Sequence, residues 1–252
     1  MKADLDLALR AAREAGELLL GFYGLEPEGL GSKSSETDLV SDADREAERA
    51  IRELLAAERP RDGLLAEEGS SSDAESGRRW IVDPLDGTIN FLYGFPAWAV
   101  SIALEDGEGL ALGVVHSPVH AETFHAVRGE GAWLGERPLR VRASTRLGRA
   151  MVATGFSYEA ERRAEQAEVI SRVLPRARDI RRAGAAALDL AWVAAGRLDA
   201  FYERGLKAWD LAAGQLLVEE AGGAVQALEG TPSGVIAAAN RELLDELAEL
   251  VI

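Results

Sequence analysis

The sequence contains no cysteine, so this chain has neither disulfide bonds nor thiolate metal sites. That composition is typical of a reducing compartment. Basic residues are also scarce, because 28 Lys and Arg stand against 43 Asp and Glu, which gives a net charge of -15. A surface of this sign repels nucleic acids and anionic membranes and attracts cations. We therefore expect neither a nucleic-acid partner nor a membrane partner.

Long apolar stretches are missing as well. The most apolar one, residues 185–196, is interrupted by Asp189 and is too short to span a bilayer. The first residues include acids where a signal peptide would need basic and then apolar residues, so we expect a cytoplasmic protein. The chain has 252 residues, 47% of them hydrophobic, which is enough for one large domain or for two lobes packed together.

Two kinds of pattern follow one another along the chain. Residues 1–145 predict two amphipathic helices and then a run of strands separated by turns, which is typical of an antiparallel meander. Residues 146–252 predict strands that alternate with helices, which indicates an α/β arrangement. We therefore predict a mixed α/β (α+β) fold with an N-terminal lobe at 1–145 and a C-terminal lobe at 146–252, joined in one compact unit.

The elements behind this division follow from hydrophobic periodicity and from turn residues. The predicted helices lie at about 4–22, 41–59, 158–174, 184–195 and 211–221, and from 240 onwards. The predicted strands lie at about 64–66, 80–82, 97–105, 110–115, 122–127, 152–154, 179–181 and 198–202, with a further hairpin at 129–142.

The stretch from Trp80 to Phe91 carries the strongest functional signal. An apolar strand runs into two carboxylates, Asp83 and Asp86, which are followed by a Gly-Thr turn. Burying unpaired carboxylates is unfavourable, so we expect a cation to compensate them, and oxygen-only ligands suit Mg²⁺. On spacing alone an ordinary turn explains the pattern as well, because Asp and Gly are common turn residues.

Other acids also have structural explanations that the residues alone leave open. Glu67 and Glu68 follow a short strand, where adjacent acids usually form a solvated turn. Asp44 stands three residues after Ser41, as in a capping box. Asp210 stands just ahead of an apolar helix, in the N-cap position, where a carboxylate can also be a metal ligand at the positive end of the helix dipole.

The histidines do not favour a zinc site. All three, His116, His120 and His125, fall in the strand-rich part of the chain. His116 and His120 flank Pro118 and so share no helix face, and no acid-rich pattern joins them.

In combination and in this order, the acidic motifs resemble the inositol monophosphatase family. That family belongs to the lithium-sensitive, magnesium-dependent phosphatases, together with the fructose-1,6-bisphosphatases. The resemblance rests on Glu67-Glu68, on Asp83-Pro-Leu85-Asp86-Gly87-Thr88 and on Trp209-Asp210-Leu-Ala-Ala-Gly214, with support from Lys33 to Asp44, 129–133, 181–189 and 194–203. It covers nearly the whole chain. It implies a layered αβαβα sandwich of the sugar-phosphatase type, with the site between the two parts, and by analogy a homodimer.

The resemblance also implies metal ligands. Glu67, Asp83 and the backbone carbonyl of Leu85 would hold one Mg²⁺. Asp83 would bridge to a second ion, completed by Asp86 and Asp210. A third, weaker ion is expected near Glu67, so that two or three ions would bind each subunit.

Catalytic and substrate-binding roles are implied in the same way. Thr88 and Asp44 resemble the pair that helps to deprotonate the attacking water, with Glu67 beside them. Gly87 and Thr88 would present backbone N–H groups to the phosphate, as expected of a turn that leads into a helix. The other residues expected around the substrate are Arg181, Gly184, Ala185, Glu203 and Asp210.

These roles imply Mg²⁺-dependent hydrolysis of a small phosphate monoester by in-line attack of metal-activated water. The first expected substrate is myo-inositol 1-phosphate. Fructose 1,6-bisphosphate, histidinol phosphate or a nucleotide phosphate remain open, because a fold does not fix its substrate. A non-catalytic binding or regulatory protein on the same fold is a further alternative. The complete set of acids and the lack of a basic stripe argue against it as the main role.

Overall fold

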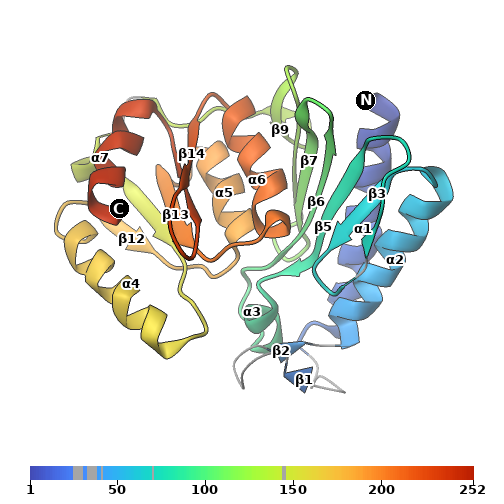
Figure 1. The fold of residues 1–252 in the computed structure, drawn as a ribbon, viewed down its shortest axis with the longest axis horizontal. Coiled ribbons are helices and arrows are strands. Elements are labelled where there is room, and N and C mark those ends of the chain that lie inside the picture. Colours follow the sequence, from blue (N-terminus) through green and yellow to red (C-terminus); the bar gives the residue numbers. More distant parts are fainter. Residues whose placement is uncertain (25–30, 33–38, 41, 70, 144–145) are drawn as a thin grey trace.

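The computed structural model describes residues 1–24, 31–32, 39–40, 42–69, 71–143 and 146–252. Lys33 and the Ser41 cap, both named above, lie outside these described residues. Within them, helices and two sheets alternate in five layers (Figure 1). The helices are α1 (Lys2–Phe22), α2 (Asp42–Glu58), α3 (Thr88–Leu92), α4 (Ala160–Val173), α5 (Ala186–Ala194), α6 (Ala208–Glu220) and α7 (Arg241–Val251), with a 3₁₀ turn at Leu147–Arg149.

The larger sheet is built entirely from the first half of the chain. Its strand order is β10-β9-β8-β7-β6-β5-β3-β4, and only the β3–β5 pair is parallel. Its strands are β3 (Gly63–Ala66), β4 (Ser71–Ser72), β5 (Arg79–Asp86), β6 (Ala99–Asp106), β7 (Gly109–Ser117), β8 (Glu122–Val127), β9 (Gly131–Leu134) and β10 (Arg137–Pro138). A separate antiparallel pair joins β1 (Gly31–Ser32) to β2 (Leu39–Val40). The antiparallel meander predicted for this half is confirmed.

The smaller sheet comes from the second half and has the order β12-β11-β13-β15-β14. Its strands are β11 (Met151–Thr154), β12 (Asp179–Arg181), β13 (Ala200–Arg204), β14 (Ala224–Leu228) and β15 (Gly234–Ala238). β11 pairs in parallel with both β12 and β13, whereas β15 runs antiparallel to β13 and β14. The β14–β15 hairpin was missed in the sequence.

The layers form because each face of the two sheets is covered by helices that bury their apolar side against it. α1 and α2 cover the outer face of the larger sheet, α5 and α6 lie between the sheets, and α4 and α7 cover the smaller sheet (Figure 1). In α1 the apolar side chains recur every three or four residues and are buried against this sheet, as an amphipathic helix requires. Alanines recur on both helices of the middle layer, and these small side chains let α5 and α6 approach both sheets closely.

The αβαβα layering implied by the resemblance is therefore confirmed. We keep the division into two lobes as a proposal, since α5 and α6 from the second half contact strands of both sheets. None of the helices in the described ranges is both long enough and apolar enough to cross a bilayer.

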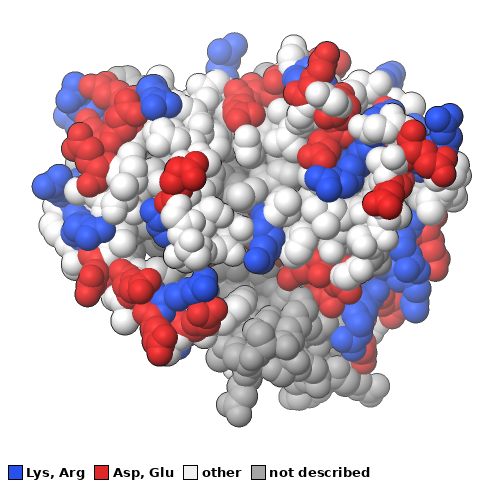
Figure 2. All heavy atoms as spheres, in the orientation of Figure 1, with Lys and Arg blue, Asp and Glu red and all other residues white. Residues whose placement is uncertain are grey.

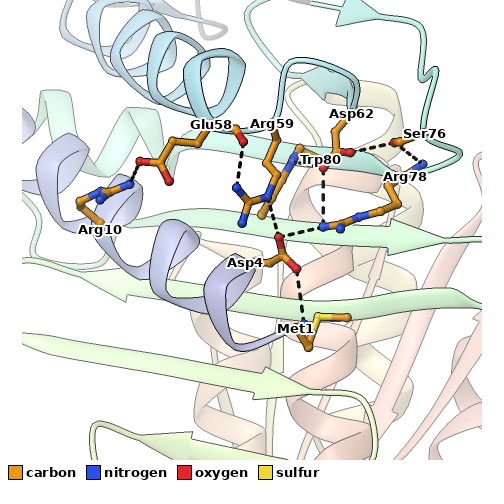
Figure 3. Close-up of polar contacts among 9 residues, drawn as sticks. All are labelled: Met1, Asp4, Arg10, Glu58, Arg59, Asp62, Ser76, Arg78 and Trp80. Carbon is orange, nitrogen blue, oxygen red and sulfur yellow. Dashed lines mark hydrogen bonds and ion pairs between the residues drawn. The ribbon is translucent and has the colours of Figure 1, made fainter.

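A buried charge cluster joins the start of the chain to the larger sheet (Figure 3). Asp4, only 6% exposed, accepts a hydrogen bond from Arg59 Nε at 2.7 Å and lies 3.0 Å from Arg78 Nη2. Arg78 also lies 3.6 Å from Asp62, which accepts a hydrogen bond from Trp80 Nε1 at 3.1 Å. The cluster thus holds α1 against the chain between α2 and β3 and against the start of β5.

We expect Asp4→Asn to destabilise the protein by about 1–3 kcal/mol at pH 7, because two half-buried arginines lose their buried charged partner. Burial raises the pKa of Asp4, but hydrogen bonds from Arg59 and Arg78 outweigh it and hold that pKa below its usual value. This contribution is therefore complete above about pH 4 and is lost as the pH falls through the folded-state pKa.

Urea unfolding of the wild type and of Asp4→Asn at several pH values measures this. The gap between the two should narrow as the pH is lowered from 7 towards about 3. Asp6→Asn, on an exposed position of the same helix, is the matched control and should change little at any pH. A gap that stays constant with pH would contradict the role given to the Asp4 carboxylate.

Candidate active site

An irregularity at the end of β5 brings its two carboxylates to one face of the sheet. Asp83 pairs with Ser101 of β6 and Asp86 pairs with Ala99, so three residues on β5 are matched by two on β6. In a regular strand, side chains three residues apart point to opposite faces. The extra residue of this β-bulge cancels the alternation, so Asp83 and Asp86 share the face that is turned towards α5 and α6.

These carboxylates are buried close to one another. Asp83 is 1% exposed and Asp86 7% exposed. Burial, followed by the charges of Glu67 and Asp86, raises the pKa of Asp83 well above its usual range. Burial and the charge of Asp210 raise the pKa of Asp86 to about 8. The site therefore concentrates negative charge that the described residues only partly compensate.

The N-terminus of α5 provides part of that compensation. The backbone N–H groups of Ala186 and Ala187 donate to Asp86 at 3.1 and 2.8 Å, and that of Leu188 approaches it at 3.4 Å. These are the groups that a helix leaves unpaired in its first turn, at the positive end of its dipole. Asp86, at the end of β5, thus caps a helix from the other half of the chain.

Asp210 occupies a different place in its helix from the one we predicted. α6 begins at Ala208, so Asp210 is its third residue and Lys207 takes the N-cap position. The Asp210 carboxylate accepts the backbone N–H of Lys207 at 2.6 Å, as the acid of a capping box does. Desolvation raises the pKa of Asp210 to about 7. The hydrogen bond from Lys207 lowers this pKa, and the charge of Glu67 raises it further. We predicted the start of this helix three residues too late, because the residues before Asp210 lack the apolar spacing that marks the rest of the helix.

Gly87 and Thr88 form the turn between β5 and α3. Gly87 has φ = 90°, and a Cβ there would lie 2.8 Å from the carbonyl oxygen of Ala97, so only glycine fits. The Thr88 hydroxyl lies 3.3 Å from Asp44 Oδ2 and 3.0 Å from the Leu85 carbonyl oxygen, and its one proton can go to either. Asp44 is fully buried in the first turn of α2. The structure thus brings the predicted Thr88–Asp44 pair together.

A cavity of about 920 Å³ opens onto these groups. Glu67, Asp83, Leu85, Asp86, Gly87 and Thr88 line it from the first half of the chain, and Gly184, Ala186, Glu203, Lys207 and Asp210 from the second. Desolvation, then the charges of Asp210 and Asp86, raises the pKa of Glu203 to about 8. Ala185 is buried at the N-cap of α5 and does not line the cavity.

Of two adjacent arginines, the structure brings Arg182 to the cavity and not Arg181. The Arg181 guanidinium lies 2.6 Å from Asp179 on the exposed side of β12. Arg182 lines the cavity, with its guanidinium 6.0 Å from the ring centre of Phe156. The two residues are alike in sequence, and only the end of β12 at Arg181 distinguishes them.

Two residues that support the site were not predicted from the sequence. Asn90, in α3, donates to the carbonyl oxygens of Ala97 at 2.6 Å and of Ala183 at 2.9 Å, and so ties the motif turn to the chain before α5. The buried Glu48 accepts the backbone N–H of Glu68 at 2.6 Å and so fixes the turn that presents Glu67. The position of Asn90 inside the motif segment could have indicated its role, whereas nothing in the sequence around Glu48 indicates one.

The donors at this site suit a hard divalent cation. They are carboxylate and carbonyl oxygens without nitrogen or sulfur, and a carboxylate has about four lone-pair sites, more than the three backbone N–H groups that reach Asp86 or the one that reaches Asp210. Burial first, and then the charges of neighbouring acids, raise the pKa values of Asp83 and Asp86, and a nearby positive charge would oppose both effects. Among the described residues no three acidic or histidine side chains converge tightly enough to surround one ion as they stand. The chemistry and charge of the donors nevertheless fit such an ion.

Comparisons with known proteins place this geometry in a family. A sequence model of the inositol monophosphatase family matches residues 2–251. An inositol-1-monophosphatase of Caulobacter vibrioides is 41% identical over 96% of this chain and 98% of its own length. A Nus factor SuhB of Pasteurella multocida is 38% identical over 98% of this chain and 96% of its own. The crystal structure of the extragenic suppressor protein suhB from Bartonella henselae superposes with a TM-score of 0.92 at 41% identity, over 99% of this chain and 98% of that one. This chain belongs to the inositol monophosphatase family.

Proposed function

We propose that this protein is a Mg²⁺-dependent phosphatase that hydrolyses a small polyol phosphate, most simply myo-inositol 1-phosphate. One observation carries the proposal. Asp83, Asp86, Asp210 and Glu67 come from both halves of the chain and line one cavity, beside the hydrogen-bonded Thr88–Asp44 pair.

Five groups would hold the cation. Glu67, Asp83 and the Leu85 carbonyl would bind one ion, and Asp83, Asp86 and Asp210 a second. Bound there, Mg²⁺ would neutralise the phosphate oxygens, lower the pKa of a water molecule and stabilise the departing oxygen. A third ion beside Glu67 belongs to the same proposal.

Thr88 and Asp44 would orient the attacking water and take its proton. When the Thr88 hydroxyl donates its proton to Asp44, which lies 3.3 Å away, its oxygen remains an acceptor for a water proton. Asp44 is buried, and burial disfavours a charged carboxylate, so a proton that moves towards Asp44 stabilises it. Glu67 lies on the same wall of the cavity and would hold the water on its other side.

The phosphate and the alcohol would occupy different ends of the cavity. Backbone N–H groups of Gly87 and Thr88 begin α3 and would donate to the phosphate. Glu203 and Gly184 line the part of the cavity formed by the smaller sheet and would meet the sugar hydroxyls, together with Asp210. Arg181 and Ala185, which do not line the cavity, would act only indirectly.

A binding or regulatory role is a second candidate, favoured by relatives that are named Nus factors, such as the one from Pasteurella multocida. On the face shown in Figure 2, basic side chains are interspersed with acidic ones and form no continuous stripe among the residues that are described. Such a surface gives nucleic acid little to bind. Retention on an RNA column at physiological salt would support this second role.

We expect phosphate release from myo-inositol 1-phosphate in the presence of Mg²⁺ and none with a chelator. Fructose 1,6-bisphosphate should be hydrolysed more slowly if the polyol is the preferred alcohol. Equal rates would point to a broad sugar-phosphate phosphatase, and no release from either substrate would contradict the proposed reaction.

Replacing Asp83 by Asn should lower kcat on the order of 100-fold or more, because it removes the charge that the two ions would share. The fold should survive, since Asn can still accept the Leu85 N–H that Asp83 accepts at 3.0 Å. Asp73→Asn makes the same replacement at an exposed aspartate and is the matched control. Near wild-type turnover by Asp83→Asn would remove Asp83 from the metal site.

Mg²⁺ should also stabilise the wild type. At about 100 times its dissociation constant a ligand adds about 2.7 kcal/mol, which for a chain of this size raises the Tm by about 5–10 °C. Thermal unfolding with Mg²⁺ and with chelator measures the shift, which should shrink in Asp83→Asn. A wild-type Tm that ignores both additions would argue against the metal site, whatever the activity.

A further inference from the structure

A glycine lies beside Glu203 where the two central strands of the smaller sheet end. β11 and β13 run in parallel, with Thr154 of one paired with Tyr202 of the other, so the next pair in register is Gly155 and Glu203. Residues paired in this way point to the same face of a sheet. A Cβ built on Gly155 would overlap the Glu203 carboxylate, that is Cδ and both carboxylate oxygens. The carboxylate thus occupies the space that a side chain at 155 would fill.

The Glu203 carboxylate has no polar partner among the residues that the structure describes, since none of them forms a hydrogen bond or an ion pair with it. Asp210 and Asp86 repel it, Asp189 also interacts with it as a like charge, and Arg182 attracts it. The position of Glu203 in the cavity is therefore set by shape, namely by the room above Gly155.

We propose that Gly155 is a positioning residue that sets substrate specificity through Glu203. The proposal rests on the proposed function, in which the Glu203 carboxylate accepts hydrogen bonds from hydroxyl groups of the alcohol half. A site built to accept such hydrogen bonds discriminates strongly against esters that lack the hydroxyls. Gly155, which also lines the cavity, thereby selects polyhydroxylated phosphate esters through the place that it leaves for Glu203 and not through a side chain of its own.

The geometry makes this role separable from a role in folding. The φ angle of Gly155 lies outside the left-handed region, so its backbone accepts alanine without strain. The atoms that the added methyl group would meet are the far end of a flexible side chain, which can rotate away. Gly184, on the same wall, gives room to Arg182, but its φ of 91° makes any substitution there strained. Gly155→Ala is thus the clean perturbation.

Steady-state kinetics with Mg²⁺ on two substrates test the proposal. Myo-inositol 1-phosphate offers hydroxyls to Glu203, whereas p-nitrophenyl phosphate offers none. In Gly155→Ala we expect KM for inositol 1-phosphate to rise by about 10- to 100-fold, the effect of leaving buried hydroxyl groups without their hydrogen-bond partner. The kcat/KM for p-nitrophenyl phosphate should stay within about twofold of wild type.

Two further variants distinguish positioning from general disturbance. In Gly148→Ala the added methyl lies at an ordinary 3.7 Å from the Arg176 carbonyl oxygen, so neither substrate should be affected. Glu203→Asp shortens the side chain by one methylene. Added to Gly155→Ala, it should recover part of the lost activity on inositol 1-phosphate, although alone it lowers that activity.

Equal losses on both substrates, no loss on either, or loss of the folded state in Gly155→Ala would overturn the proposal. So would strictly additive effects of the two substitutions. Failure of the proposed function is recognised separately, because in that case the wild type itself would release no phosphate from inositol 1-phosphate.

Discussion

The central constraint of this structure is the gathering of like charges in the interior. Asp83 and Asp86 lie buried on one face of β5, with Asp210 and Glu67 within electrostatic reach. Besides burial, the charges of Glu67, Asp86 and Asp210 raise the pKa of Asp83, and the charge of Asp210 raises that of Asp86. Such a cluster opposes folding unless donors or cations offset it. The first turn of α5 and the cap of α6 supply backbone donors, which is why both middle-layer helices begin at the site.

Because those donors come from the second half of the chain and the β5 acids from the first, neither half can complete the site alone. Asp86 accepts hydrogen bonds from α5 across about 100 residues, and Asn90 bonds to Ala183 across a similar interval. The same contacts fix the relative position of the two sheets. Forming the cavity and packing the middle layer are therefore one event, and substitutions at the acids affect stability and chemistry together.

Local patterns predicted much of this from the sequence. Amphipathic spacing located α1, and the alternation of apolar residues located the meander that carries the motif. The features that could not be predicted depend on contacts between distant segments of the chain. The bulge that turns Asp83 and Asp86 to one face is a matter of register with β6, and the start of α6 is fixed by the Asp210 capping bond. Likewise, the choice of Arg182 over Arg181 follows from where β12 ends.

Glycines show most clearly why the site could be only partly predicted. In a sequence every glycine suggests a turn or a flexible joint. In the structure Gly87 serves a turn with positive φ, whereas Gly155 leaves room for a carboxylate from a neighbouring strand. The second use has no local signature, because the side chain that fills the space lies 48 positions away, at Glu203. Around Glu203 the cavity is shaped by a missing side chain as well as by those present. If the proposed function holds, substrate preference within this fold can change at a residue that contributes no side chain of its own to the site.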